Sequence, residues 1–148
     1  MKQEFSYEFG WMITRVTRRR KRFMTARLAE KGLGGALYHY VLAVHHNPGE
    51  SQDFLVEYFC ADKGNVARAV KKLEEEGFIR READKCDRRQ NCIVLTEKGE
   101  EAVKEVDAHL REWNKLLTAG FTDEELEIAH RLISRMEQNV SDAFDGNK

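Results

Sequence analysis

Apolar residues recur at helical spacing over most of this 148-residue chain. The clearest example is the segment 63–76, where one apolar stripe leaves the rest of the surface polar and basic; its members are Val66, Ala69, Val70 and Leu73. Residues 51–59 predict a shorter helix that begins at Ser51, a residue type favoured as an N-cap. Two helices joined by a tight connection at 60–62 are typical of a helix-turn-helix.

A strand-like pattern follows the second of these helices. Gly77 stands where a helix C-cap needs a residue that tolerates positive φ. Residues 78–83 then alternate like a half-buried strand, residues 84–89 form a charged turn, and residues 90–95 predict a returning strand. A helix-turn-helix followed directly by a basic-tipped hairpin is a winged helix.

Helical patterns also precede this motif. Residues 5–31 predict a long first helix with apolar residues on one side, namely Phe9, Met12, Ile13, Val16 and Phe23. Five basic residues at 18–22 fit either a phosphate-contacting patch or the solvated face of a helix. Three closely spaced glycines separate this helix from a second one at 36–46, which ends before a proline-glycine turn.

The chain after the hairpin predicts two long helices with apolar seams. Thr96 can cap the first, which extends to about residue 117 and repeats apolar residues every three or four positions. A capping box at Thr122 and Glu125 begins the second. A winged helix of roughly 60 residues is too small to bury these seams, so we expect an intertwined homodimer. A monomeric bundle that folds the terminal helices back on itself is the alternative.

Charge is distributed unevenly along the chain. The net charge of −1 would by itself argue against nucleic acid. However, residues 1–60 carry 9 Lys/Arg against 6 Asp/Glu, residues 61–98 carry 10 against 8, and residues 99–148 carry 6 against 12. A basic winged helix with acidic C-terminal helices fits a protein that presents one face to phosphate.

Three segments resemble the MarR family of transcriptional regulators: Lys-Leu-Glu-Glu-Glu-Gly-Phe-Ile-Arg-Arg at 72–81, Asp-Arg-Arg at 87–89, and Leu-Thr-Glu-Lys-Gly at 95–99. The resemblance covers nearly the whole chain in length and helix order. It implies a mainly α fold class with a small β-hairpin wing. The expected organisation is one unit over 1–148, with a winged helix-turn-helix at 34–96 and helical dimerisation regions at 5–31 and 97–145.

The predicted recognition helix and wing supply the candidate DNA-binding residues: Lys63, Gly64, Asn65, Arg68, Lys71, Lys72, Lys85, Arg88 and Arg89. Asn65 can bond bidentately to adenine, Arg68 can read guanine or hold a phosphate, and the lysines are expected to contact phosphates. By resemblance, Asp87 orients a wing arginine. The chain departs from the family pattern at Ala67, where a threonine is common, so the operator sequence stays open.

A two-fold dimer would read double-stranded DNA as a pseudo-palindrome, with half-site centres about 10 base pairs apart. The resemblance implies a repressor more often than an activator. It also implies a small aromatic or other hydrophobic effector, bound between the dimer helices and the winged helix. The candidate effector-binding residues are Tyr7, Trp11, Arg15, Tyr38 and His39. Packing of these aromatic residues in the core is the alternative.

Other functions fit the sequence less well. Cys60 and Cys92 are expected to be small core residues and Cys86 to be exposed, so a thiol-based redox switch is only an alternative form of regulation. No CxxC or HxxxH spacing supports a metal site, and neither metal nor other cofactor is expected. No nucleophile elbow or phosphate-cradling glycine loop indicates an enzyme.

A winged helix that binds protein partners instead of DNA is the principal rival interpretation. The sequence has no 18-residue apolar run and no hydrophobic signal core. We therefore expect no membrane partner and a cytoplasmic protein with reduced thiols.

Overall fold

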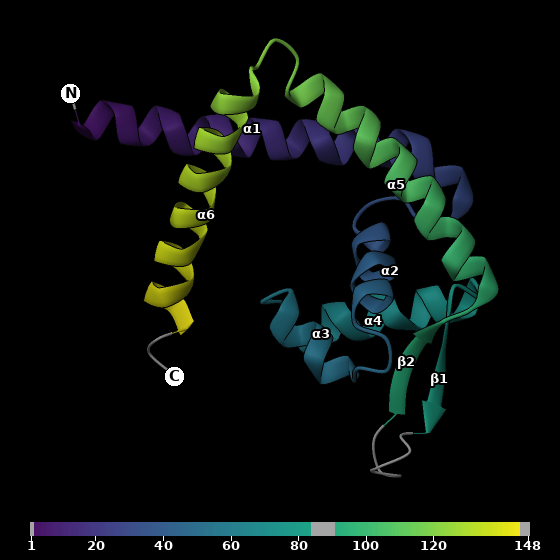
Figure 1. Cartoon of the computed structure of the whole chain (residues 1–148). Coiled ribbons are helices and arrows are strands. Elements are labelled where there is room, and N and C mark those ends of the chain that lie inside the picture. Colours follow the sequence, from purple (N-terminus) through teal and green to yellow (C-terminus); the bar gives the residue numbers. More distant parts are fainter. Residues whose placement is uncertain (1, 84–90, 146–148) are drawn as a thin grey trace. The chain divides into compact units, whose positions relative to one another are not determined.

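The computed structural model describes residues 2–83 and 91–145, and these are mainly helical. In chain order the elements are α1 (Lys2–Leu28), the 3₁₀ turn η1 (Ala29–Lys31), α2 (Leu37–His46), α3 (Gln52–Tyr58), α4 (Lys63–Glu75), β1 (Ile79–Ala83), β2 (Asn91–Leu95), α5 (Glu97–Leu117) and α6 (Asp123–Asp145) (Figure 1). The chain divides into two compact units, residues 1–113 and 114–148.

The helix-turn-helix consists of α3 and α4, as predicted, and side-chain caps begin both helices. The Ser51 hydroxyl accepts a hydrogen bond from the Phe54 N–H at 3.2 Å, and the Asp62 carboxylate accepts one from the Asn65 N–H at 3.0 Å. The predicted stripe of α4 faces the core, where Val66, Val70 and Leu73 are buried and Ala69 is partly buried. The opposite face of α4 is therefore left to solvent.

The strands β1 and β2 form an antiparallel hairpin in which Ile79 pairs with Leu95 and Ala83 pairs with Asn91. Gly77 has a φ of +77°, as its C-cap position requires. The predicted alternation of buried and exposed residues in β1 is wrong, because only Ile79 is buried and the next four residues are exposed. The strand extends away from the core after its first residue, so both of its faces meet solvent.

The stretch before α3 also pairs with the hairpin, which the sequence pattern did not indicate. Gly49 N–H donates to the Ile93 carbonyl at 3.1 Å, and Ile93 N–H donates to the Glu50 carbonyl at 2.9 Å. Ser51 forms an isolated bridge with Cys92. The hairpin is thus anchored to the start of the helix-turn-helix.

One core cluster joins α1, α2, α4, the hairpin and α5 within the first unit. Its largest fully buried side chains are Met24, Leu28, Leu33, Tyr38, Leu55, Leu73, Ile79 and Ile93. α5 begins as predicted, with the Thr96 hydroxyl accepting from the Gly99 N–H at 3.1 Å. The same hydroxyl donates to the Gly77 carbonyl at 2.6 Å. The N-terminus of α5 is consequently fixed against the end of α4.

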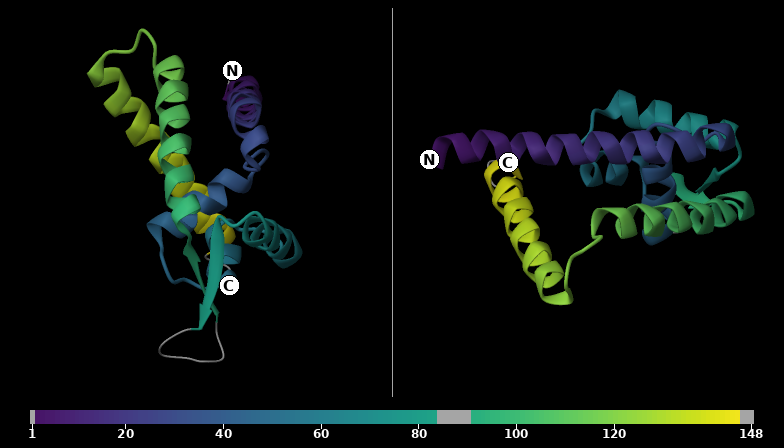
Figure 2. Two further views of the ribbon diagram at one scale, coloured as in Figure 1. Left: turned by 90° about the vertical axis from the view of Figure 1, so that its right-hand side faces the viewer. Right: turned by 90° about the horizontal axis from the view of Figure 1, so that it is seen from above.

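The first helix is one unbroken element in Figure 2, and it ends three residues earlier than predicted. The chain passes through η1 and turns at Gly32, whose φ is +78°. Arg27 ties α1 to α5 through two hydrogen bonds to the Glu112 carboxylate, at 2.7 and 3.1 Å. The guanidinium of Arg27 also lies 3.5 Å from the centre of the Phe23 ring. These contacts fix the C-terminal half of α1 on the core.

The second unit contains the end of α5 and the whole of α6. The predicted capping box is confirmed, since Glu125 N–H donates to the Thr122 hydroxyl at 3.2 Å and Thr122 N–H donates to the Glu125 carboxylate at 2.9 Å. Several large apolar residues of this unit are exposed: Leu116, Leu117, Phe121, Ile128, Leu132, Ile133, Met136 and Val140. In the described residues, no helix combines the length and apolar character that a membrane crossing needs.

Candidate nucleic-acid interface

The exposed face of α4 carries the candidate DNA-binding residues that the structure describes. Asn65, Arg68, Lys71 and Lys72 are exposed, and Lys63 begins the helix. Because Val66, Val70 and Leu73 occupy the opposite face, α4 cannot rotate without exposing core residues. The fold therefore presents these polar and basic side chains on a fixed helix surface.

The first turn of α4 is a connected group of side chains. Asp62 caps the helix through Asn65 N–H, and the Arg68 guanidinium donates from Nη2 to the Asn65 side-chain oxygen. A Cβ atom at Gly64 would lie 3.0 Å from the Asp62 carboxylate and 3.5 Å from Arg68 Nη1. The Arg68 guanidinium thus lies over the first turn, beside Gly64.

The lysines of α4 differ in their partners. Lys63 forms an ion pair with Asp53 at 3.1 Å, and Lys71 forms one with Glu75 at 3.7 Å. Lys72 pairs with no carboxylate among the residues that the structure describes. Exposed ion pairs contribute about 0–1 kcal/mol, so Lys63 and Lys71 can exchange their carboxylates for phosphates at little cost.

The wing tip lies outside the described residues. The predictions made there concern Lys85, Cys86, Asp87, Arg88 and Arg89. In the described part of the wing, the arginines are engaged with the protein: Arg80 donates to Glu82 at 2.6 Å, and Arg81 donates to Glu74 at 3.3 Å and to Gln52 at 3.2 Å. These two arginines stabilise the hairpin and its junction with α3 and α4.

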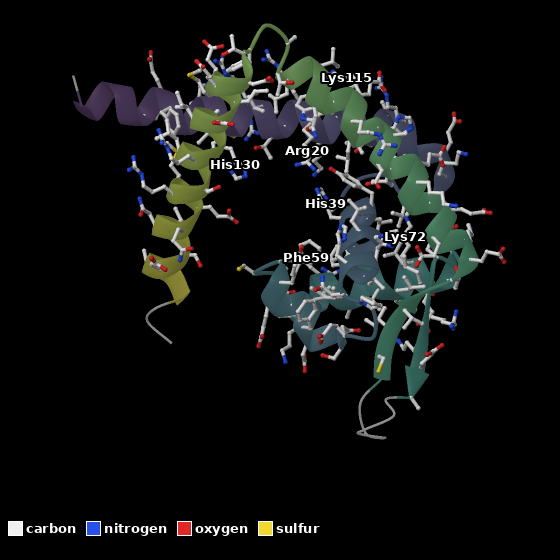
Figure 3. All side chains as sticks on the ribbon, viewed as in Figure 1. Arg20, His39, Phe59, Lys72, Lys115 and His130 are labelled. Atoms are coloured by element: carbon white, nitrogen blue, oxygen red, sulfur yellow. The ribbon has the colours of Figure 1, made fainter. Side chains whose placement is uncertain are left out.

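A second group of polar residues lies where α1 packs on α2. Arg20 reaches from α1 toward His39 at the start of α2 (Figure 3), and the rings of Tyr38 and His39 lie 3.9 Å apart. The Nε atom of Arg20 is enclosed and has no hydrogen-bond partner in the described part of the chain. A buried donor without an acceptor costs about 1–3 kcal/mol, so Arg20 carries an unsatisfied polar atom at this junction.

The positive charge of Arg20 affects both neighbouring rings. Burial lowers the pKa of His39, and the charge of Arg20 lowers it further, which favours the neutral imidazole. Burial raises the pKa of Tyr38, and the Arg20 guanidinium acts in the opposite direction by charge and hydrogen bonding. This group, Arg20 with Tyr38 and His39, is called the arginine corner below. It holds a cation, a neutral imidazole and a protonated phenol.

The other candidate effector-binding residues lie farther along α1. Tyr7 and Trp11 are 80% and 47% exposed, Arg15 is exposed, and Arg18 stacks over Trp11 with its guanidinium 5.6 Å from the ring centre. Helical rise places Tyr7 roughly 20 Å from the arginine corner along the helix. Tyr38 and His39 belong to the arginine corner, whereas Tyr7 and Trp11 lie apart from it on an exposed stretch of α1.

Arg20 is the residue that sequence reasoning missed, because it was grouped with the basic run 18–22. A signal was present, since residue 20 continues the stripe of Ile13, Val16 and Phe23 at spacings of three and four residues. The neighbouring Arg18, Arg19, Lys21 and Arg22 are exposed, as expected for a solvated face. One arginine of the run points inward and the others point outward.

The described cysteines also differ from expectation. Cys60 was predicted to be a small core residue, but it is exposed. It lies in the turn between α3 and α4 with a φ of +46°, and its thiol faces the Glu57 carbonyl at 3.6 Å. The positive φ turns this side chain away from the core. Cys92 is partly buried, and the described residues contain no cluster of three or more His, Cys, Asp or Glu that could hold a metal.

Comparison with known proteins is consistent with this geometry. The MarR family model matches residues 36–90. The HTH-type transcriptional regulator BilQ of Clostridium symbiosum (strain WAL-14163) is 30% identical over 114 residues, which cover 77% of this chain and 79% of that protein. The crystal structure of the transcriptional regulator SlyA superposes with a TM-score of 0.88 at 28% identity, over 95% of this chain and 99% of that one.

A MarR family transcriptional regulator from Listeria monocytogenes, crystallised with a 26mer DNA, has the same fold, with a TM-score of 0.83 at 23% identity over 88% of this chain and 87% of that one. A helix-turn-helix with a hairpin wing and long flanking helices defines the class of winged-helix transcriptional regulators. The chain belongs to the MarR family of that class, a family of regulators and not of enzymes.

Proposed function

We propose that this protein is a cytoplasmic repressor that binds a pseudo-palindromic operator as a homodimer and is controlled by a small aromatic acid. The observation that carries the DNA-binding part is the exposed face of α4. The apolar side of this helix is locked in the core, and its exposed side presents Asn65, Arg68 and Lys72. An α-helix of this kind fits the major groove, where its N-terminal residues reach the base edges.

The homodimer is supported by apolar surface that the described chain leaves exposed. On α1 this surface includes Trp11, Met12, Ile13 and Val16, and α6 adds Ile133 and Val140 among others. Large apolar side chains exposed along a helix in this number mark an interaction surface. A second copy of the chain presents the same helices, so a two-fold interface buries both sets together. Two copies of α4 then read two half-sites.

The effector is proposed to place its acid group at the arginine corner. The enclosed Arg20 Nε needs an acceptor, and a carboxylate supplies one with opposite charge. The partly buried His39 ring lies beside it, and Tyr38, which is buried in the core, packs behind that ring. The corner lies between α1, a proposed dimerisation helix, and α2, which packs on α4. Binding there can bias the spacing of the two α4 helices if one spacing binds the acid better.

DNA binding is tested by fluorescence anisotropy with a duplex from the protein's own upstream intergenic region and a scrambled duplex, at two salt concentrations. We expect selective binding that weakens with salt, because counterions are released from each neutralised phosphate. Lys72→Ala should weaken binding to both duplexes and reduce the slope of log affinity against log salt by about 1. Arg68→Ala should instead reduce the preference for the specific duplex, and Arg111→Ala on α5 is the control.

Absence of selective binding to the upstream duplex would contradict autoregulation at that site. Absence of binding across a randomised DNA library would contradict the DNA-binding proposal. In that case the rival interpretation, a winged helix that binds protein partners, becomes the better one. The length of operator DNA that the protein protects tests the homodimer. A two-fold dimer should protect two half-sites whose centres lie about 10 base pairs apart. Protection of one half-site by a monomer contradicts it.

The effector proposal is tested with benzoate and hydroxybenzoates as probes, by displacement of bound DNA and by thermal shift. We expect both effects in the wild type and neither in Arg20→Gln, which removes the charge at the corner. Arg19→Gln is the matched control, because Arg19 is the neighbouring residue and is exposed. Equal responses of the two variants would show that the acid binds elsewhere.

A further inference from the structure

The first turn of α4 couples two side chains that sequence reasoning treats as independent base readers. Asn65 alone suits adenine, and Arg68 alone suits guanine or a phosphate. In the structure, Arg68 Nη2 donates to the Asn65 side-chain oxygen. Both side chains are exposed on the face that is proposed to enter the major groove. The hydrogen bond therefore changes which groups remain available to DNA.

The chemistry of the two groups fixes the orientation of the Asn65 amide. A guanidinium carries only donors, whereas an amide has an oxygen acceptor on one side and an NH₂ donor on the other. If the amide were flipped, its NH₂ group would oppose the N–H groups of Arg68. The oxygen must face Arg68, and the NH₂ group then points away from it.

This hydrogen bond competes with adenine reading by Asn65, because it occupies one of the two lone pairs of the amide oxygen. A bidentate contact with adenine needs the amide oxygen to accept from N6–H while the NH₂ group donates to N7. With one lone pair of its oxygen engaged by Arg68, Asn65 presents mainly its NH₂ donors, and the guanidinium carries only donors. Guanine presents two acceptors, N7 and O6, on its major-groove edge, which matches this donor-rich surface.

We infer that Asn65 and Arg68 form one unit that reads guanine, with Arg68 contacting the base and Asn65 acting as a positioning residue. This inference rests on the proposed DNA-binding function and specifies the base that the site selects. One N–H group of Arg68 is bound to the Asn65 side-chain oxygen, and the remaining N–H groups of the guanidinium are left to contact the base. A guanidinium held before binding loses less freedom when it binds.

The neighbouring residues keep the unit in place. The Asn65 backbone is fixed because its N–H donates to the Asp62 cap at 3.0 Å. Gly64 lies beside the unit, where a Cβ atom would make ordinary contact with Arg68 Nη1 at 3.5 Å. The inferred base-reading unit is thus built directly on the N-cap of α4.

The test is a selection from randomised duplexes by the wild type and by Arg68→Ala, Asn65→Ala and Asn65→Asp, read as base preference at each position. Aspartate keeps an oxygen for Arg68 but cannot donate to a base. Its negative charge weakens binding to all sequences alike, so the preference at each position is the readout. All four proteins are used as the full chain.

We expect one guanine per half-site with a preference of about 5-fold to 100-fold, the usual range for a bidentate contact. Arg68→Ala abolishes this preference, Asn65→Ala weakens it at the same position, and Asn65→Asp restores it. Loss of an adenine preference at a different position in Asn65→Ala, with the guanine unchanged, would overturn the inference. A wild type that selects no sequence would overturn both the inference and the proposed function, so the two failures are distinguishable.

Discussion

Gly99 occupies the tightest glycine site in the described chain, and replacing it with alanine should destabilise the fold strongly. It lies in the first turn of α5, where a Cβ atom would be 2.2 Å from the Phe78 carbonyl oxygen. The Leu95 side chain closes the site from another direction at 3.1 Å. A carbonyl of the backbone cannot rotate away as a side-chain tip can. Gly99 therefore permits the close approach of α5 to the chain between α4 and β1.

The size of the destabilisation follows from the backbone shift that an alanine at position 99 would require. The Phe78 carbonyl has to withdraw by about 0.8 Å before the contact reaches 3.0 Å. That carbonyl accepts from the Thr96 N–H at 3.0 Å and from the Thr96 hydroxyl at 3.2 Å. Overpacking costs about 1–3 kcal/mol, and each weakened hydrogen bond costs about 1 kcal/mol. Alanine has a helix propensity about 1 kcal/mol more favourable than that of glycine, which offsets part of this cost. The free energy of unfolding is therefore expected to fall by about 3 kcal/mol.

The measurement is urea unfolding followed by circular dichroism, at a fixed protein concentration because the proposed dimer makes stability depend on concentration. Gly64→Ala is the matched control, since Gly64 lies in the first turn of α4 and its nearest neighbours are side-chain atoms. We expect Gly64→Ala to stay within about 1 kcal/mol of the wild type. A Gly99→Ala protein as stable as Gly64→Ala would refute the reasoning, because the carbonyl would then have room to move.

Two further predictions concern titration and capping. Burial and the neighbouring guanidinium hold the pKa of His39 below its ordinary 6.5, so on acidification the unfolded chain takes up a proton before the folded protein does. The free energy of unfolding should therefore fall as pH drops from about 7 toward the lower folded pKa. Urea titrations at several pH values should show a flatter profile for His39→Gln than for the wild type, and an equally steep profile would contradict this reasoning. Thr122→Ala removes the hydroxyl that accepts from the Glu125 N–H, which should cost about 1 kcal/mol. Faster amide exchange in the first turn of α6 would report this, and Glu124→Gln, next to the capping pair, should leave the exchange nearly unchanged.

Much of the candidate DNA-binding helix could be predicted because its signals are local. The apolar stripe of α4 repeats at the period of the helix, so its buried and exposed faces follow from residue order alone. The caps at Ser51, Thr96 and Thr122 act on N–H groups three residues away, and all three are confirmed. The burial of β1 could not be predicted in this way. An alternating pattern states which residues share a face but not whether that face meets another element.

The same limit explains the differences at individual residues. Five consecutive basic residues at 18–22 have equivalent charges in sequence, and only the packing of α2 on α1 distinguishes Arg20 as the one that points inward. Cys60 resembles a small core residue until the backbone of its turn is known. The glycine at position 99 carries no local signal either, because the atom that excludes a side chain belongs to Phe78, far back in the chain.

The sequence by itself therefore determined the helices, their caps and the two faces of α4, since each depends on residues within a few positions of one another. It also carried the resemblance to the MarR family, through short segments that can be read in order along the chain. Tertiary structure decided the arginine corner, the glycine contact of α5 with the chain between α4 and β1, and the anchoring of the hairpin to the stretch before α3. These features depend on which elements, distant in sequence, lie side by side. The local order of residues does not specify the burial and hydrogen bonding across such contacts.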